Sequence, residues 1–494
     1  MGISVIFYPI SLKEKINNLV KQKVILYWVA FYILLLISLT YSRNQELSWR
    51  FLRTMIPLFS FPLAFGLVGG LSKKLLSKIF IIFQSSLLGV LIYNIALTFL
   101  NKETQLYDYR GLSFTVSHLR LGYFLLFALF LTYLSFMRNH ASSIIAWIFL
   151  ICFSLGLILF KSVGMIPPLL LGCVLFLKEC IAIKSSFSKI FEFIILIVAG
   201  IIIFAAVEAG FAFFYFNKRP QANEIAERKV NASGFLHKDT TLWLENGVPA
   251  LMNIHEESLA NAWALRSAYP YEGKDLRGQE LRVTMWRYLA SCGHWVKDSA
   301  ALIDLSESDI RAIEKGLTNR LMKNPFRLAG RFYEFFWELR QYRLDGDPRG
   351  RSVSTRIELW RASIQVIQDN LRRGVGLGDT RYHLKEMLDV MHSTLSYNLS
   401  YGPHSQWLGL LLAGGIPLLS WWLFTLLMPI INLKSKHLNN LIFFTTLMIW
   451  CGLWEDIFET QASVSFFSFF YWVLYQECVS DEGLKFGLKQ GTKA

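Results

Sequence analysis

The chain has 494 residues, of which 53% are hydrophobic and 15% aromatic, and its formal net charge is +14. Soluble globular domains are less apolar than this, so the composition predicts an integral membrane protein. A basic chain can also be a nucleic-acid-binding protein, but we expect no nucleic-acid partner, because the positions of the lysines and arginines follow membrane topology.

Apolar runs recur along the chain, and a membrane span takes about 20 such residues. Ten runs reach or approach that length, at residues 24–40, 52–70, 75–100, 119–136, 142–160, 163–177, 190–216, 406–432, 439–454 and 463–478. Lysines precede the first run, as in a signal peptide, but no small-residue cleavage site follows it. We therefore expect a retained first helix.

Lysines and arginines concentrate in alternate short loops, as in the loops 71–78 and 178–189. Because cytoplasmic loops are the basic ones, this bias predicts that both termini are cytoplasmic and that the long polar segment lies outside. The predicted fold class is all-α, a polytopic membrane protein with about ten transmembrane helices and a large helical outer domain. The expected domains are an N-terminal membrane domain at 1–216, an outer domain at 217–405, a C-terminal membrane domain at 406–480 and a cytoplasmic tail at 481–494.

The outer segment has helical patterns at 302–320, 326–344 and 355–371, the first opened by a capping box of Ser306 and Asp309. Cys292 is its one cysteine, so it has no internal disulfide framework. The chain contains no CxxC or HExxH spacing, and we expect neither a metal site nor a cofactor.

A candidate catalytic group lies where the outer segment meets the run that begins at Gln406. His404 follows Pro403 there, and an imidazole at this boundary can take a proton from a substrate with a polar head and a lipid tail. The alternative is that Pro403 and His404 only end a loop and begin a helix.

Arginines cluster in the C-terminal half of the outer segment, where a guanidinium can bind phosphate oxygens in a bidentate way. They are Arg340, Arg343, Arg349, Arg351, Arg356, Arg361, Arg372, Arg373 and Arg381. The cluster suits a lipid-linked pyrophosphate, and the alternative is surface ion pairs and contacts with lipid headgroups.

Two further features have functional and structural interpretations. The glycine turn 374–379 (GVGLGD) allows close approach to an anion, but it follows a helix rather than a strand, so the alternative is a helix terminator.

Glu208 is the deepest acid in an apolar run, which makes it a functional candidate. A transporter would carry more such groups, with paired broken helices.

Three short motifs resemble the O-antigen ligase and polymerase-like membrane proteins, most closely the ligase type with a large outer loop. The first joins Arg356, Trp360 and Ala362 to the glycine turn, and His118-x-Arg120 also fits. The second is Gly402-Pro403-His404 with Gly414-Gly415-Ile416, and the third is Trp454-Glu455-Asp456 with Glu459. Two positions depart from the family pattern: Ser405 stands where Asn is usual, and Lys161 where an arginine is common.

The resemblance implies a glycosyltransferase in the inner membrane of a Gram-negative bacterium, working without nucleotide, metal or cofactor. It implies that a glycan passes from polyprenyl pyrophosphate to lipid A core or another hydroxyl acceptor, among membrane lipids, at the periplasmic face. His404 and Arg356 would be catalytic, and the substrate would be bound by Arg120, Lys161, Gly376, Arg361 and Arg381. A repeat-unit polymerase and a protein O-oligosaccharyltransferase remain alternatives, as do, from another class, a transporter and a non-catalytic membrane scaffold.

Overall fold

The computed structural model describes residues 23–68, 71–100, 113, 116–136, 144–160, 163–172, 187–237, 243–324, 327–397 and 401–491. Helices make up most of this part of the chain. Its one sheet has two strands of two residues each, β1 (Leu244–Glu245) antiparallel to β2 (Val248–Pro249). The predicted all-α class is therefore confirmed.

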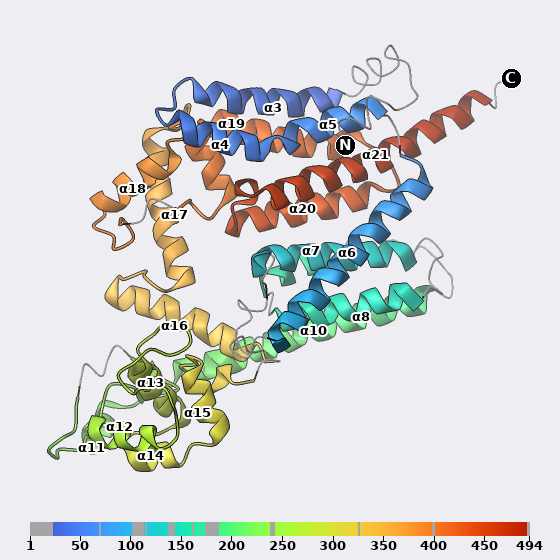
Figure 1. The fold of residues 1–494 in the computed structure, drawn as a ribbon. Helices are drawn as coiled ribbons and strands as arrows, with labels where there is room; N and C mark the ends of the chain where they lie inside the picture. Colours follow the sequence, from blue (N-terminus) through green and yellow to red (C-terminus); the bar gives the residue numbers. More distant parts are fainter. Residues whose placement is uncertain are drawn as a thin grey trace.

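The apolar runs form a bundle of helices that lie in roughly the same direction, with α6 crossing the others obliquely (Figure 1). Its members are α3 (Lys23–Leu39), α4 (Gln45–Met55), α5 (Pro57–Val68), α6 (Lys73–Leu100), α7 (His118–Ser135), α8 (Ile144–Leu159), α10 (Phe187–Asn217), α19 (Gln406–Asn432), α20 (Leu438–Trp454) and α21 (Gln461–Gly491). The second run is divided between α4 and α5, because Pro57 begins a new helix. The sixth run begins with η2 (Val163–Met165), and residues 173–177 of it lie outside the described part.

Aromatic side chains fill the centre of the bundle. Trp28 of α3 is fully buried and packs against Trp422, Phe467, Tyr471 and Trp472 of α19 and α21. Because such rings bury large areas and interlock in edge and stacked arrangements, they hold the N-terminal and C-terminal apolar segments of the sequence in one unit.

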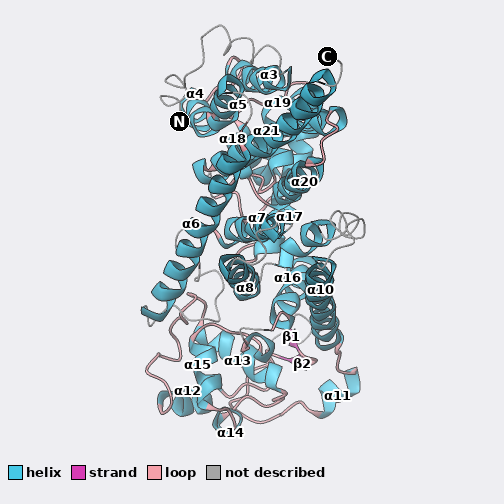
Figure 2. Ribbon diagram, turned by 90° about the vertical axis from the view of Figure 1, so that its right-hand side faces the viewer, coloured by secondary structure: helices cyan, strands magenta, loops and turns pink. Residues whose placement is uncertain are grey.

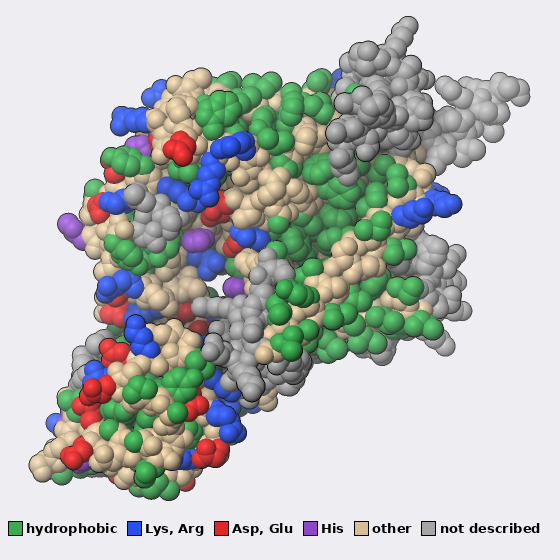
Figure 3. Space-filling view, viewed as in Figure 1, with side chains coloured by type: hydrophobic (Ala, Val, Ile, Leu, Met, Phe, Trp, Pro, Cys, Tyr) green, Lys and Arg blue, Asp and Glu red, His purple; other side chains and the backbone are tan. Residues whose placement is uncertain are grey.

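The outside of the bundle is also apolar (Figure 3). Ile33 of α3, Ile82 of α6 and Ile144 of α8 are among its exposed side chains. Among the described helices, Lys73–Leu97 and Gln406–Asn432 are long and apolar enough to cross a membrane, and five other apolar helices are shorter. The figure of ten spans remains a prediction.

The outer segment forms a small lobe and a set of helices that join this lobe to the bundle (Figure 2). The helices are α11 (Ala222–Glu227), α12 (Glu256–Ala264), α13 (Leu281–Cys292), α14 (Ser299–Ile303), α15 (Glu307–Glu314), η3 (Arg320–Met322), α16 (Ala329–Asp345), α17 (Ser352–Asp369) and α18 (Thr380–Val390). Trp263, Trp286 and Tyr288 are fully buried in the core of the lobe.

The predicted helices at 326–344 and 355–371 are present as α16 and α17. The capping box of Ser306 and Asp309 is also present. The single helix predicted at 302–320 is wrong, because the box begins a new helix, α15, after α14 has ended. Gly316, with φ of +75°, follows the end of α15.

Glu208 joins the bundle to the outer helices. Its carboxylate accepts hydrogen bonds from Arg327 Nε at 3.0 Å, Arg327 Nη2 at 2.8 Å and the backbone N–H of Ala329 at 2.7 Å. The last of these groups belongs to the first turn of α16, where a carboxylate is favoured by the helix dipole. The structure therefore gives this acid an anchoring role in place of the functional one suggested by its depth.

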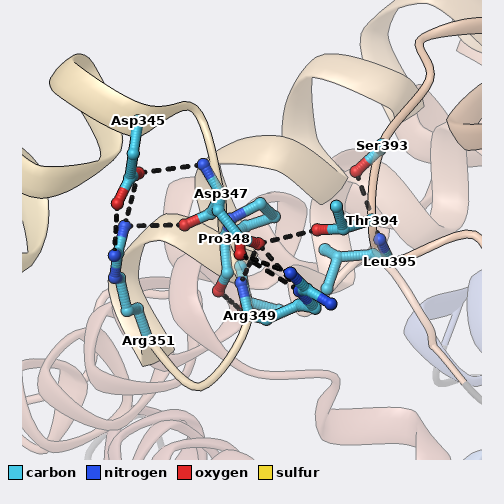
Figure 4. A network of polar contacts seen from close by, with 9 residues as sticks. Asp345, Asp347, Pro348, Arg349, Arg351, Ser393, Thr394 and Leu395 are labelled. Carbon is cyan, nitrogen blue, oxygen red and sulfur yellow. Dashed lines mark hydrogen bonds and ion pairs between the residues drawn. The ribbon is translucent and has the colours of Figure 1, made fainter.

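A polar network fixes the turn between α16 and α17 to the segment that follows α18 (Figure 4). Arg351 pairs with Asp345, and Arg349 pairs with Asp347 at 2.8 Å. Thr394 Oγ1 donates to Asp347 Oδ1 at 2.7 Å. Arg349 and Arg351 thus form ion pairs, as the structural alternative for the arginine cluster predicts. The network also holds the segment after α18, which leads towards His404, against the turn.

Candidate functional site

Helix ends at one side of the bundle meet α17 and α18, and charged side chains gather on this side of the molecule (Figure 3). Contacts between these elements define a group of seven residues, which we call the polar cluster: Arg120, Arg356, Arg381, His404, Glu455, Asp456 and Glu459. The three acids lie in the connection between α20 and α21, which includes η4 (Ile457–Glu459).

Each arginine of the polar cluster reaches this connection from a different helix. Arg120 of α7 pairs with Glu455 at 3.2 Å, and Arg381 of α18 pairs with Glu459 at 3.1 Å. Arg356, in the second turn of α17, donates from Nε to the carbonyl oxygen of Trp454 at 3.3 Å. Three guanidinium groups are therefore brought to one place by helices that are far apart in sequence.

His404 is held tightly against the acidic connection. Its φ is +49°, a region that costs a non-glycine residue on the order of 1–3 kcal/mol. The backbone N–H groups of His404 and Ser405 lie near the carboxylate of Asp456 and oppose the rise of its pKa. At Gly402 a Cβ atom would lie 2.8 Å from Glu459 Oε1. The loop before α19 thus places His404 beside Asp456 in a strained backbone conformation.

The imidazole of His404 faces a buried carboxyl group. Its Nδ1 lies 3.8 Å from Oδ2 of Asp456, and the histidine side chain is 38% exposed. Burial, followed by the positive charges of Arg356 and Arg381, lowers the pKa of His404 to about 4. The imidazole is therefore neutral at pH 7 and able to accept a proton.

The pKa values of two neighbouring acids are raised, whereas that of His404 is lowered. Burial, together with the charges of Glu459 and Glu455, raises the pKa of Asp456 well above its usual range. Burial also raises the pKa of Glu455, and the nearby Arg120 offsets only part of that effect. Groups whose pKa values are displaced in this way are typical of catalytic and binding sites.

Several buried polar atoms at this place lack a hydrogen-bond partner among the described residues. They are Nε of Arg120, Nε of Arg381, Oδ2 of Asp456 and Nε1 of Trp360. They account for four of the twelve such atoms in the described part of the chain, although buried polar groups are normally paired. Their concentration here indicates a site that receives a polar ligand.

The structure brings together four of the predicted site residues, namely His404, Arg356, Arg120 and Arg381. Arg361 lies elsewhere: its side chain is 59% exposed, and its Nη1 contacts Glu358 at 3.3 Å and the hydroxyl of Tyr342 at 3.1 Å. Arg361 is therefore a surface ion-pair residue in this structure. Lys161 lies outside the described residues.

Gly376 has a packing role in this structure, and its predicted contact with substrate remains a prediction. Its N–H donates to the carbonyl oxygen of Ala413 at 3.1 Å, and a Cβ atom at this glycine would lie 2.9 Å from that of Ser42. The turn fits against α19 where Gly415, with φ of +66°, kinks that helix. Close packing at Gly376 thus explains the glycine without an anion.

The role of Asp456 as the partner of His404 was not predicted from the sequence. The signal was present in the Trp454-Glu455-Asp456 motif, but the motif does not show which of its acids meets the histidine. The structure identifies it: Oδ2 of Asp456 lies 3.8 Å from Nδ1 of His404, whereas Glu455 pairs with Arg120 and Glu459 with Arg381.

No family model matches this chain, and no curated protein matches it either.

Proposed function

We propose that the protein is a membrane glycosyltransferase of the O-antigen ligase type. It would move a glycan from polyprenyl pyrophosphate to lipid A core at the periplasmic face of the inner membrane of a Gram-negative bacterium. The observation that carries the proposal is the contact of His404 with the buried Asp456, between Arg356 and Arg381, at the end of an apolar bundle. A base beside several phosphate-binding groups is what transfer from a lipid pyrophosphate requires.

The direction of the helices supports the proposed topology of ten spans. The start of α7, the end of α20 and the start of α19 meet at the polar cluster, and all three were predicted to lie outside. The loop from α19 to α20, with Lys434 and Lys436, lies at the opposite end of the bundle, as does the C-terminal end of α21 (Figure 1). Basic loops are thus separated from the site by the length of the helices.

In the proposed reaction, Nε2 of His404 takes the proton of the acceptor hydroxyl, and the carboxyl group of Asp456, whose Oδ2 lies 3.8 Å from Nδ1, acts as an anion that offsets the positive charge of the imidazolium. The acceptor oxygen forms a bond to the anomeric carbon while the bond from that carbon to the pyrophosphate oxygen breaks. The pyrophosphate leaves with the electron pair, and Arg356 and Arg381 offset its charge. The proton on His404 is then released to water, which restores the pair.

Arg356 and Arg381 link the binding of the donor pyrophosphate to the pKa of His404. In the free site they lower the pKa of His404, which makes the imidazole a weak proton acceptor. A pyrophosphate bound between them would cancel much of their positive charge and raise that pKa towards its ordinary value. His404 would thus become an effective base when the donor is in place.

Lipopolysaccharide from a deletion strain tests the proposal and separates its rivals. A ligase predicts loss of the whole O-antigen ladder on an intact core. A single-repeat band in place of the ladder would instead indicate a polymerase, and an unchanged ladder with loss of glycoproteins would indicate a protein O-oligosaccharyltransferase. Purified protein that transfers no glycan from a polyprenyl pyrophosphate donor to any of these acceptors would contradict the whole class.

A further inference from the structure

Three tryptophans continue the polar cluster along α17 and α20, and we call Trp360, Trp450 and Trp454 the aromatic shelf. The ring centroids of Trp360 and Trp454 are 5.3 Å apart with an interplanar angle of 47°, and those of Trp450 and Trp454 are 6.4 Å apart. Trp360 lies one helical turn after Arg356 on α17, so both residues face the same side of the helix. Because Arg356 donates to the carbonyl oxygen of Trp454, the shelf and this arginine share one wall.

The shelf is both fixed and accessible. Nε1 of Trp450 donates to the carbonyl oxygen of Gly164 at 2.7 Å, which ties α20 to the turn after α8. Trp454 is nevertheless 42% exposed, unlike the fully buried tryptophans of the bundle core. Nε1 of Trp360 is buried and has no hydrogen-bond partner among the described residues. Packing within the protein therefore does not account for all of this aromatic surface.

We propose that the aromatic shelf binds the sugar ring that is bonded directly to the donor pyrophosphate. This inference rests on the proposed function, which places the pyrophosphate at Arg356 and Arg381. The first sugar is bonded to the pyrophosphate and must therefore lie next to Arg356. The tryptophans form the surface that adjoins this arginine. A pyranose offers an apolar face of C–H groups and a rim of hydroxyls, which suits a flat aromatic surface beside charged groups.

An alternative explanation for an exposed tryptophan is a position at the lipid interface, where Trp and Tyr are enriched in membrane proteins. Trp49 of α4 supplies a matched control, because it is 53% exposed and has no part in the polar cluster. A purely interfacial role for Trp454 predicts that leucine at either position has the same effect. A sugar subsite predicts that only the substitution at Trp454 changes the preference for a glycosylated lipid.

The test measures binding of purified protein in nanodiscs to two probes, bare polyprenyl pyrophosphate and the same lipid carrying one N-acetylhexosamine. We expect the wild type to prefer the glycosylated probe about tenfold. Trp454→Leu should abolish this preference while leaving the affinity for the bare lipid unchanged. Trp454→Tyr should keep most of the preference, and Trp49→Leu all of it.

The outcomes separate this inference from the function on which it rests. A wild-type preference that survives in Trp454→Leu would overturn the subsite and leave the glycosyltransferase proposal intact. Equal binding of the two probes by the wild type would do the same. A wild-type protein that binds neither lipid would overturn the proposed function, and the subsite with it.

Discussion

Replacing Asp456 by asparagine tests the partnership with His404 while preserving the shape of the side chain. The carboxyl group is buried and its pKa is raised, so the neutral amide should be tolerated and the unfolding temperature should hardly change. The amide, however, cannot become the anion that stabilises the imidazolium formed when His404 takes the acceptor proton.

The size of the effect follows from the distance between the two groups. Opposite unit charges 3.8 Å apart attract by about 4 kcal/mol at an effective dielectric constant of about 20. Since the histidine side chain is 38% exposed, solvent screening reduces this to roughly 2 kcal/mol. Asp456→Asn should therefore lower kcat by about 30-fold.

The assay is glycan transfer in nanodiscs at saturating donor, with protein amount and unfolding temperature measured in parallel. Glu455→Gln is the matched control, because Glu455 is a neighbouring, partly buried acid that pairs with Arg120 rather than with His404. We expect its kcat to fall less than that of Asp456→Asn. A folded Asp456→Asn protein with wild-type kcat would refute the proposed role of this carboxyl group.

Three further predictions concern the charge around His404 and the topology. Arg356→Ala should reduce transfer by about 10- to 100-fold, and Arg356→Lys should restore it only in part because lysine lacks the bidentate fork; full activity of the alanine variant at normal protein level would return Arg356 to the surface-pair interpretation. The pKa of His404 is lowered to about 4, so kcat/KM should hold as the pH falls below 6.5 and decline only near pH 4. Arg381→Gln should move that decline to higher pH, and an unchanged profile would remove Arg381 from the site. Reporter fusions at Lys323 and Lys434 should report opposite sides of the membrane, and the same side for both would defeat the topology.

The sequence allowed the helices of the fold to be predicted, because apolar length and capping are local properties. The apolar runs correspond to the bundle helices, and the capping box of Ser306 begins α15. Partners distant in sequence could not be predicted in the same way. Glu208 was recognised as unusual, but its partner Arg327 is separated from it by the small lobe, so its anchoring role appears only in three dimensions.

The candidate site was predicted in part for a related reason. Helical periodicity identifies α17, but it does not show which side of the helix faces the bundle. Arg356 and Arg361 are five residues apart and therefore point roughly 140° away from each other, so that one reaches Trp454 and the other the buried acid Glu358. The glycine turn was ambiguous because glycine permits both anion binding and close packing, and Gly376 packs.

The central claim is that His404 is the base that takes the acceptor proton, and transfer by His404→Asn tests it most directly. Asparagine tolerates the positive φ of this position better than most residues, so the substitution removes the base and keeps the backbone. His383→Asn is the control, because His383 lies outside the polar cluster and contacts Glu386 at 3.2 Å.

General-base help is typically worth about 100- to 10,000-fold in rate. The account predicts a loss of that size in His404→Asn, in protein that is folded, inserted and still able to bind bare polyprenyl pyrophosphate, and near-normal transfer in His383→Asn. Transfer by His404→Asn at close to the wild-type rate would contradict the account, because His404 would then only end the loop before α19.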